Sequence, residues 1–159
     1  MNADPSCAAS ILPQRKQLPH EIPWWVTQGA RHFITVNALQ REAAPFAAPA
    51  IAEALMRGLL AYEALGKWHL WVGVVMPDHL HFIATFARGT GIPDDMRAWK
   101  SYQAKTLKLE FQAGFFEHRL RNDEEYVDKA AYIRLNPVRR GLVAAAEEWP
   151  YLIDRFFVR

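Results

Sequence analysis

The sequence has only one cysteine, Cys7, among its 159 residues. A single cysteine excludes a disulfide framework and a cysteine-rich zinc site within the chain, and it is typical of a reducing compartment. Long apolar runs are also absent, because Pro45, Pro49 and Glu53 interrupt the best candidate for a membrane span. The polar start of the chain has no basic n-region of a signal peptide. We therefore expect a cytoplasmic protein that has no membrane partner.

Neither sign of charge dominates the sequence, since 19 Lys and Arg residues against 17 Asp and Glu residues leave a formal net charge of +2. Bulk charge alone therefore does not indicate a nucleic-acid partner, and the positions of the basic residues matter more than their sum. Hydrophobic residues make up 51% of the chain, which is typical of a globular protein. The length fits one core. We expect an irregular leader over residues 1–28, one folded domain over 29–151 and a C-terminal tail over 152–159.

Runs rich in β-branched and aromatic residues predict strands, and apolar residues at helical spacing predict helices. The expected strands cover residues 32–36, 68–76, 79–86 and 115–119. The expected helices cover residues 51–65, 94–111 and 122–136. The resulting order, β-α-β-β-α-β-α, is typical of a ferredoxin-like α+β fold with an antiparallel sheet, here with an added C-terminal helix.

The helix boundaries follow from capping residues and from one proline. Asp94 or Asp95 is expected to cap the second helix. Asn122, with Glu125 three residues later, matches a capping box at the start of the third helix. Pro137 predicts the end of that helix one residue earlier, because the residue before a proline is disfavoured in the α region.

Two histidines flank one leucine at the start of the third predicted strand, directly after a turn that contains Asp78. Because side chains at i and i+2 of a strand share a face, His79 and His81 are expected to point the same way, with Leu80 turned into the core. Two imidazoles side by side make half of a site for a divalent metal. Two polar residues on a half-exposed strand would give the same pattern, so the pair is informative only together with a second cluster.

That second cluster lies on the third predicted helix, where Tyr132 and Asn136 are one turn apart. On a helical projection both lie opposite an apolar side, whose members are Tyr126, Val127, Ala130 and Ala131. A core tyrosine would normally belong to the apolar side. A phenol is a weak nucleophile at neutral pH, because its unperturbed pKa is about 10. A divalent ion on the histidine pair could polarise the electrophile, and Asn136 could supply a third, oxygen ligand.

The segment Met76-Pro-Asp-His-Leu-His81, followed by Tyr132-Ile-Arg-Leu-Asn-Pro-Val-Arg-Arg-Gly-Leu-Val143, resembles the IS200-like single-tyrosine HUH transposases. Within them it is similar in particular to the REP-associated tyrosine transposases. HUH stands for histidine, hydrophobic residue, histidine, and the motif 79–81 fits it. The similarity runs from about residue 29 to residue 151. Either block alone would be unspecific, whereas their combination is specific.

The resemblance implies a nucleoid-associated enzyme that nicks single-stranded DNA near hairpins, either REP-like hairpins or transposon ends. It implies that Tyr132, on the added helix, attacks a phosphodiester and leaves a 5′-phosphotyrosine and a free 3′-OH. It further implies that His79 and His81 bind Mg²⁺ or Mn²⁺, with Asn136 in the place of the third ligand.

Basic residues around the predicted third helix favour phosphate contacts over a merely solvated surface. The expected DNA contacts are Arg119, Arg121, Arg134, Arg139 and Arg140, with Lys100 and Lys105 as weaker candidates. His118 is a candidate for orienting a metal ligand or for a structural hydrogen bond. Trp24, Trp25 and Trp99 could stack on unpaired bases, although core roles are favoured.

Three other interpretations remain open at this point. The first is a domesticated protein that binds DNA hairpins without cleaving them. The second is a single-strand or RNA-binding domain on a ferredoxin-like sheet, which would need aromatic residues where the histidine pair stands. The third is a metal-dependent hydrolase without a covalent intermediate. Both a monomer and a homodimer are compatible with the sequence.

Overall fold

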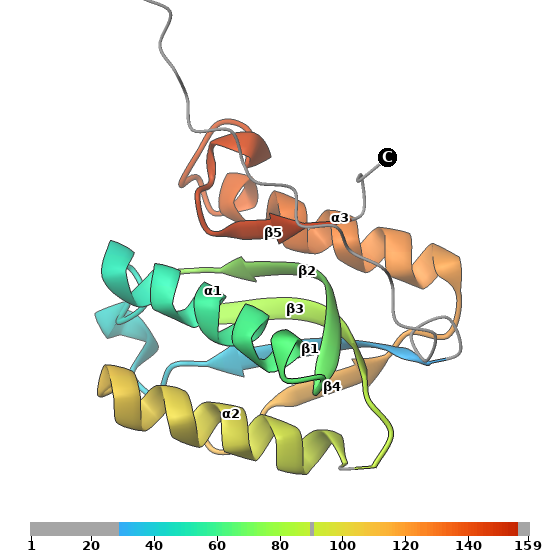
Figure 1. Ribbon diagram of the computed structural model, residues 1–159. Helices are drawn as coiled ribbons and strands as arrows, with labels where there is room; N and C mark the ends of the chain where they lie inside the picture. The colour runs from blue at the N-terminus through green and yellow to red at the C-terminus, as the bar shows by residue number, and fades with distance from the viewer. Residues whose placement is uncertain (1–28, 90, 156–159) are drawn as a thin grey trace, which may run out of the picture.

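The computed structural model describes residues 29–89 and 91–155, in which one β-sheet separates two helices from a third (Figure 1). The strands are β1 (Arg31–Asn37), β2 (Trp68–Val75), β3 (His79–Phe86), β4 (Phe116–Arg119) and β5 (Leu152–Asp154). The α-helices are α1 (Pro49–Ala64), α2 (Ile92–Leu107) and α3 (Asp123–Arg139). No helix in these ranges is long and apolar enough to cross a membrane.

The strand order is β4-β1-β3-β2-β5, and every neighbouring pair is antiparallel. β3 lies between β1 and β2, so the connection through α1 crosses over one strand, as in a ferredoxin-like sheet. The predicted fold class is therefore confirmed. β5 is a correction to the predicted tail, because residues 152–154 pair with β2 and extend the sheet by one strand. The predicted leader, with Trp24 and Trp25, lies outside the described residues, as do residues 156–159.

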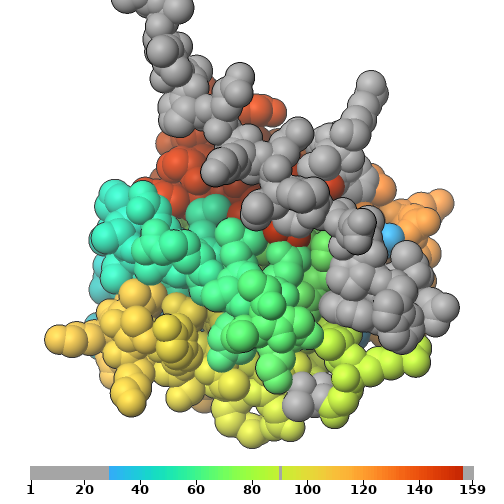
Figure 2. All heavy atoms as spheres, in the orientation of Figure 1, coloured from blue at the N-terminus to red at the C-terminus, as the bar shows by residue number. Residues whose placement is uncertain are grey.

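Each face of the sheet has its own core. On one face α1 and α2 cover a cluster that contains Leu80 and Trp99, both fully buried. Figure 2 shows the outer surface of these two helices as the cover of that face. On the other face α3 packs on a cluster that contains Phe33 and Ile133. Because both faces are covered, β2 and β3 are buried over nearly their whole length. Trp99 is fully buried in the first cluster and therefore has a packing role.

α2 begins and ends earlier than predicted. Its N-cap is Gly91, so the predicted caps Asp94 and Asp95 lie within the first turn instead. Pro93 explains the early start, because its fixed φ suits the first turn of a helix and its missing N–H has no intrahelical role there. The helix ends at Leu107 rather than at Phe111, and its C-cap Lys108 has a left-handed φ of 55°.

α3 begins as predicted and ends later. The side chain of Asn122 accepts a hydrogen bond from the backbone N–H of Glu125 at 2.8 Å, which confirms the cap. The helix continues through Pro137 to Arg139, although the proline predicted its end at Asn136. The proline removes only one hydrogen bond near the end of the helix, and the N–H of Arg140 still donates to the Asn136 carbonyl at 3.1 Å.

A partly buried carboxylate joins α1 to β2 and to the residue that follows β5. Glu63 accepts hydrogen bonds from the Leu70 backbone N–H at 2.9 Å and from Arg155 Nη1 at 2.6 Å, and it lies 3.1 Å from His69 Nδ1. Burial by itself would raise the pKa of Glu63, but these hydrogen bonds and the charge of Arg155 lower it to about 2. The cluster therefore stabilises the fold while Glu63 is ionised.

Candidate active site

His79 and His81 lie on the face of β3 that α3 covers, and their ring centroids are 4.5 Å apart. Both rings are almost fully buried. Leu80 points to the opposite core, as the alternation of a strand predicts. The His81 ring also stacks on Phe33 of β1 at 5.3 Å. The rigid centre of the sheet therefore holds two imidazoles side by side.

A hydrogen-bond partner occupies the Nδ1 atom of each ring. His79 Nδ1 lies 2.7 Å from Asp78 Oδ1, and His81 Nδ1 lies 2.8 Å from Thr35 Oγ1. A carboxylate can only accept, so His79 Nδ1 donates and the lone pair of this ring is on Nε2. A metal-binding histidine usually donates a hydrogen bond to a carboxylate, a carbonyl or a water from the ring nitrogen that does not bind the metal. His79 is thus arranged to present Nε2 as a ligand, and His81, whose Nδ1 is bonded to a hydroxyl that can donate or accept, has its Nε2 outside this hydrogen bond.

The electrostatics of the pair favour neutral rings. Burial lowers the pKa of His79 below its ordinary value, even though Asp78 opposes the shift. Burial also lowers the pKa of His81 to about 3, and the positive charges of Arg41 and Lys129 act in the same direction. Neutral imidazoles keep the lone pair that a metal ion needs. The residues present therefore fit a divalent cation.

Asp78 is the centre of an ion cluster, whereas the sequence indicated a simple turn residue. Its Oδ2 accepts from Arg41 Nε at 2.8 Å and Nη2 at 2.7 Å, and its Oδ1 accepts from Arg140 Nη2 at 3.0 Å. Burial would raise its pKa, but the hydrogen bonds from His79 and Arg41 hold the pKa of Asp78 below its ordinary value. Asp78 therefore stays ionised and fixes both His79 and the end of α3. Its position next to the histidine motif was the only signal in the sequence.

Tyr132 lies over the histidine pair. Its ring centroid is 5.5 Å from that of His81 and 6.2 Å from that of Phe33, and the residue is 36% exposed. Two cations flank the ring: Lys129 Nζ is 5.6 Å from its centroid, and Arg139 Cζ is 5.3 Å from it. Lys129 was missed in the sequence, although its spacing of one turn before Tyr132 could have indicated it.

Asn136 is placed differently from the helical projection. It is only 6% exposed and lies on the buried stripe of α3 with Tyr126, whereas Val127 is exposed. Four residues advance a helix by slightly more than one turn, so Asn136 is turned from Tyr132 toward the sheet. Within the described residues no group of three or more His, Cys, Asp or Glu could hold a metal. A metal ion on His79 and His81 would therefore need further ligands of another kind, and the side-chain amide of Asn136, one turn from Tyr132, is the predicted one.

Three of the predicted DNA contacts have other positions or partners. Arg134 Nε donates to Asp154 Oδ2 at 2.6 Å and ties α3 to β5. Lys100 Nζ donates to two backbone carbonyls of the loop 112–114. Lys100 and Lys105 both lie on α2, which covers the opposite face of the sheet from α3. The sheet therefore separates these lysines from the histidine pair.

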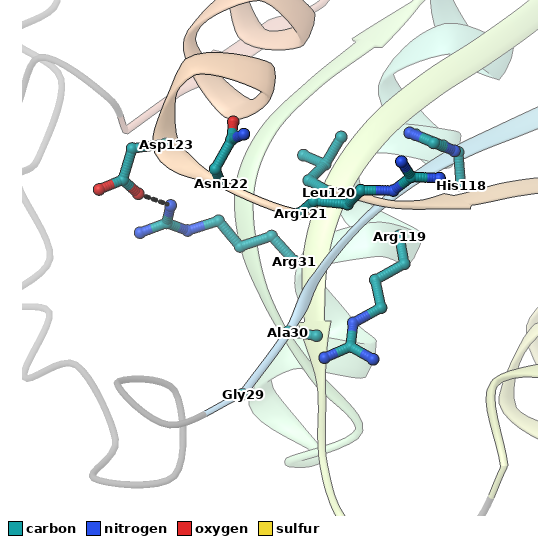
Figure 3. A pocket seen from close by; sticks show the side chains of 9 residues that line it. All are labelled: Gly29, Ala30, Arg31, His118, Arg119, Leu120, Arg121, Asn122 and Asp123. Atoms are coloured by element: carbon teal, nitrogen blue, oxygen red, sulfur yellow. Dashed lines mark hydrogen bonds and ion pairs between the residues drawn. The ribbon is translucent and has the colours of Figure 1, made fainter.

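Arg119 and Arg121 line a pocket at the far end of β4 (Figure 3). Neither histidine of the pair lines this pocket, and Tyr132 does not line it either. Figure 3 shows the Arg31 guanidinium turned to Asp123, with which it is ion-paired at 2.8 Å. His118 also lines this pocket, and its Nε2 lies 3.7 Å from a carboxylate oxygen of Glu125. The structure thus pairs His118 with α3 rather than with a histidine of the motif.

The structure thus combines a ferredoxin-like antiparallel sheet, a buried histidine pair on β3 and a tyrosine on α3 that contacts it, which is the arrangement expected from the resemblance to single-tyrosine HUH transposases. No family model matches the chain. It is 28% identical over 130 residues to the REP-associated tyrosine transposase of Escherichia coli (strain K12), over 78% of this chain and 76% of that protein. A solved structure of a REP-associated tyrosine transposase bound to a REP hairpin superposes with a TM-score of 0.69 at 27% identity, over 78% of this chain and 76% of that one. The chain is therefore similar in sequence and fold to REP-associated tyrosine transposases, the family that its motifs resemble.

Proposed function

We propose that this protein binds DNA hairpins and nicks single-stranded DNA beside them, with Tyr132 as the nucleophile. The observation that carries the proposal is the contact between the Tyr132 ring and His81, at 5.5 Å, because it unites the two motifs in one chain. The related transposase that was solved with a REP hairpin supports the DNA hairpin as the substrate class. The arginines at both ends of α3 support phosphate contacts.

The chemistry that we propose is a transfer of a phosphoryl group to the phenol. Tyr132 Oη attacks the phosphorus, a new Tyr–O–P bond forms to the 5′ phosphate, and the bond from phosphorus to the 3′ oxygen breaks. The phenol proton passes to water, and the leaving oxygen takes up a proton to give the 3′-OH. Lys129 and Arg139 flank the ring, so their charges stabilise the negative charge that develops on the phosphate. Attack of a 3′-OH on the phosphotyrosine reverses the step and joins strands.

The histidine pair and Asn136 are the proposed ligands of Mg²⁺ or Mn²⁺. The lowered pKa values of both rings support this proposal, since a neutral imidazole keeps a lone pair, and the Asp78 carboxylate on Nδ1 places that of His79 on Nε2. When bound, such an ion polarises the scissile phosphate as a Lewis acid. Nitrogen and oxygen ligands together favour Mn²⁺ over Mg²⁺ in affinity.

A covalent-adduct assay tests the proposal. Full-length protein is mixed with labelled single-stranded DNA that carries a hairpin from its own genomic neighbourhood, with Mn²⁺ or EDTA, and is run on a denaturing gel. We expect a shifted band that requires Mn²⁺ and disappears in Tyr132→Phe. Tyr102→Phe is the matched control, because Tyr102 is an exposed tyrosine on α2, across the sheet. Hairpin binding without any adduct would favour the non-cleaving hairpin-binding protein instead.

A further inference from the structure

A row of aromatic rings leads from the histidine pair to the edge of the sheet. Phe33 contacts His81 at 5.3 Å on one side and Phe116 of β4 at 6.3 Å on the other. Phe116 pairs in register with Thr35, which in turn pairs with His81. Strands are about 4.8 Å apart, so Phe116 stands about 10 Å from His81 on the same face. We call His81, Phe33 and Phe116 the aromatic row.

Phe116 is the exposed end of the aromatic row. It is 57% exposed, whereas Phe33 is buried. β4 is the last strand on its side of the sheet, so among the described residues no further strand covers Phe116 from outside. A large apolar side chain in this position exposes to water a surface that a flat partner could cover.

Cations lie beside the aromatic row and at the far end of β4. Lys129 Nζ lies 5.1 Å from the Phe33 ring, next to Tyr132. At the other end of β4, Arg119 and Arg121 line the pocket of Figure 3. An aromatic ring between cations is the arrangement with which proteins hold single-stranded nucleic acid: the base stacks on the ring and the backbone follows the cations.

We propose that Phe116 stacks on an unpaired base of the DNA strand that Tyr132 attacks, and that Arg121, beyond the end of β4, binds a backbone phosphate further along that strand. This inference rests on the proposed function and adds a subsite to it. The unpaired strand runs from the histidine pair along the edge strand β4 to the arginine pocket. The distance of about 10 Å from His81 places the stacked base close to the scissile phosphate.

Binding of two DNA probes in EDTA tests the subsite without cleavage. One probe is a blunt hairpin, and the other is the same hairpin with a short single-stranded thymidine extension. Phe116→Ala should weaken binding of the extended hairpin about tenfold and leave the blunt hairpin unchanged, because stacking acts on the unpaired base alone. Phe116→Trp should retain wild-type affinity. Tyr102→Ala is the matched control, since Tyr102 is 59% exposed but lies across the sheet.

A scan with abasic sites along the extension locates the base. One abasic position should weaken binding to wild-type protein about tenfold and should have no further effect in Phe116→Ala, because both changes remove the same contact. Equal losses for both hairpins, or no abasic position that depends on Phe116, would overturn the subsite while leaving the adduct assay positive. Failure of every hairpin to bind would overturn the proposed function and this inference together.

Discussion

Replacing Asp78 by Asn removes one negative charge from beneath the candidate metal site and keeps the shape of the side chain. Asp78 holds His79 Nδ1 at 2.7 Å and accepts from Arg41 and Arg140. In Asp78→Asn the amide no longer holds the ring in one tautomer, and the two guanidinium groups lose their shared carboxylate. Loss of a partner of this kind typically weakens metal binding by about 10- to 100-fold.

The stability cost should be smaller than the cost to metal binding. A hydrogen bond to a charged group is worth about 1.5–3 kcal/mol when both groups are buried. Arg41 and Arg140 are partly exposed, and pairs of that kind are worth about 0–1 kcal/mol. Since the amide still accepts one hydrogen bond, we expect a loss of about 1–2 kcal/mol. For a chain of this length that lowers Tm by about 2–8 °C.

Calorimetric titration of Mn²⁺ into the full-length protein without DNA measures the metal effect, and thermal unfolding measures the stability effect. Asp94→Asn is the control, because it also removes a carboxylate bonded to an arginine, but on the exposed surface of α2. A folded Asp78→Asn protein that binds Mn²⁺ as tightly as the wild type would refute the role of Asp78. A wild-type protein that binds no Mn²⁺ would refute the metal site itself.

Three further predictions concern stability and the nucleophile. The pKa of Glu63 is depressed from 4.5 to about 2, so its contribution is complete above pH 4.5 and is lost as the pH falls toward 2. Glu63→Gln should therefore cost up to about 3 kcal/mol at pH 7 and flatten the acid limb of urea-unfolding stability against pH; an unchanged acid limb would contradict this. Gly58→Ala should destabilise the fold despite the better helix propensity of alanine, because its Cβ would lie 2.1 Å from Nε2 of the buried Gln103; a raised Tm would contradict this. Lys129→Ala should slow adduct formation by Tyr132 about tenfold, or about 1.4 kcal/mol, in single-turnover assays, and Lys129→Arg should restore it.

The sequence by itself determined the features that depend on near neighbours. The alternation of a strand was enough to place His79 and His81 on one face and Leu80 in the core. The cap at Asn122 follows from a residue and its third neighbour, and it formed as predicted. The order of strands and helices was enough to predict the ferredoxin-like sheet, because few topologies satisfy short, right-handed connections. β5 was missed, since three residues carry too little periodicity to be recognised.

Only the tertiary structure decided which groups surround the histidine pair. Thr35 meets His81 across 46 residues of chain, and Arg140 meets Asp78 across 62. Such contacts depend on strand register and on how α3 is rotated on the sheet, and no local pattern encodes either quantity. The same rotation of α3 buries Asn136. It also pairs Arg134 with Asp154 of β5, whereas the sequence predicted a DNA contact for Arg134. The residue types of the two motifs, and so their chemistry, could therefore be recognised from the sequence. The groups that contact these residues were set by long-range packing, because a contact between residues distant in the sequence exists only once the core has formed.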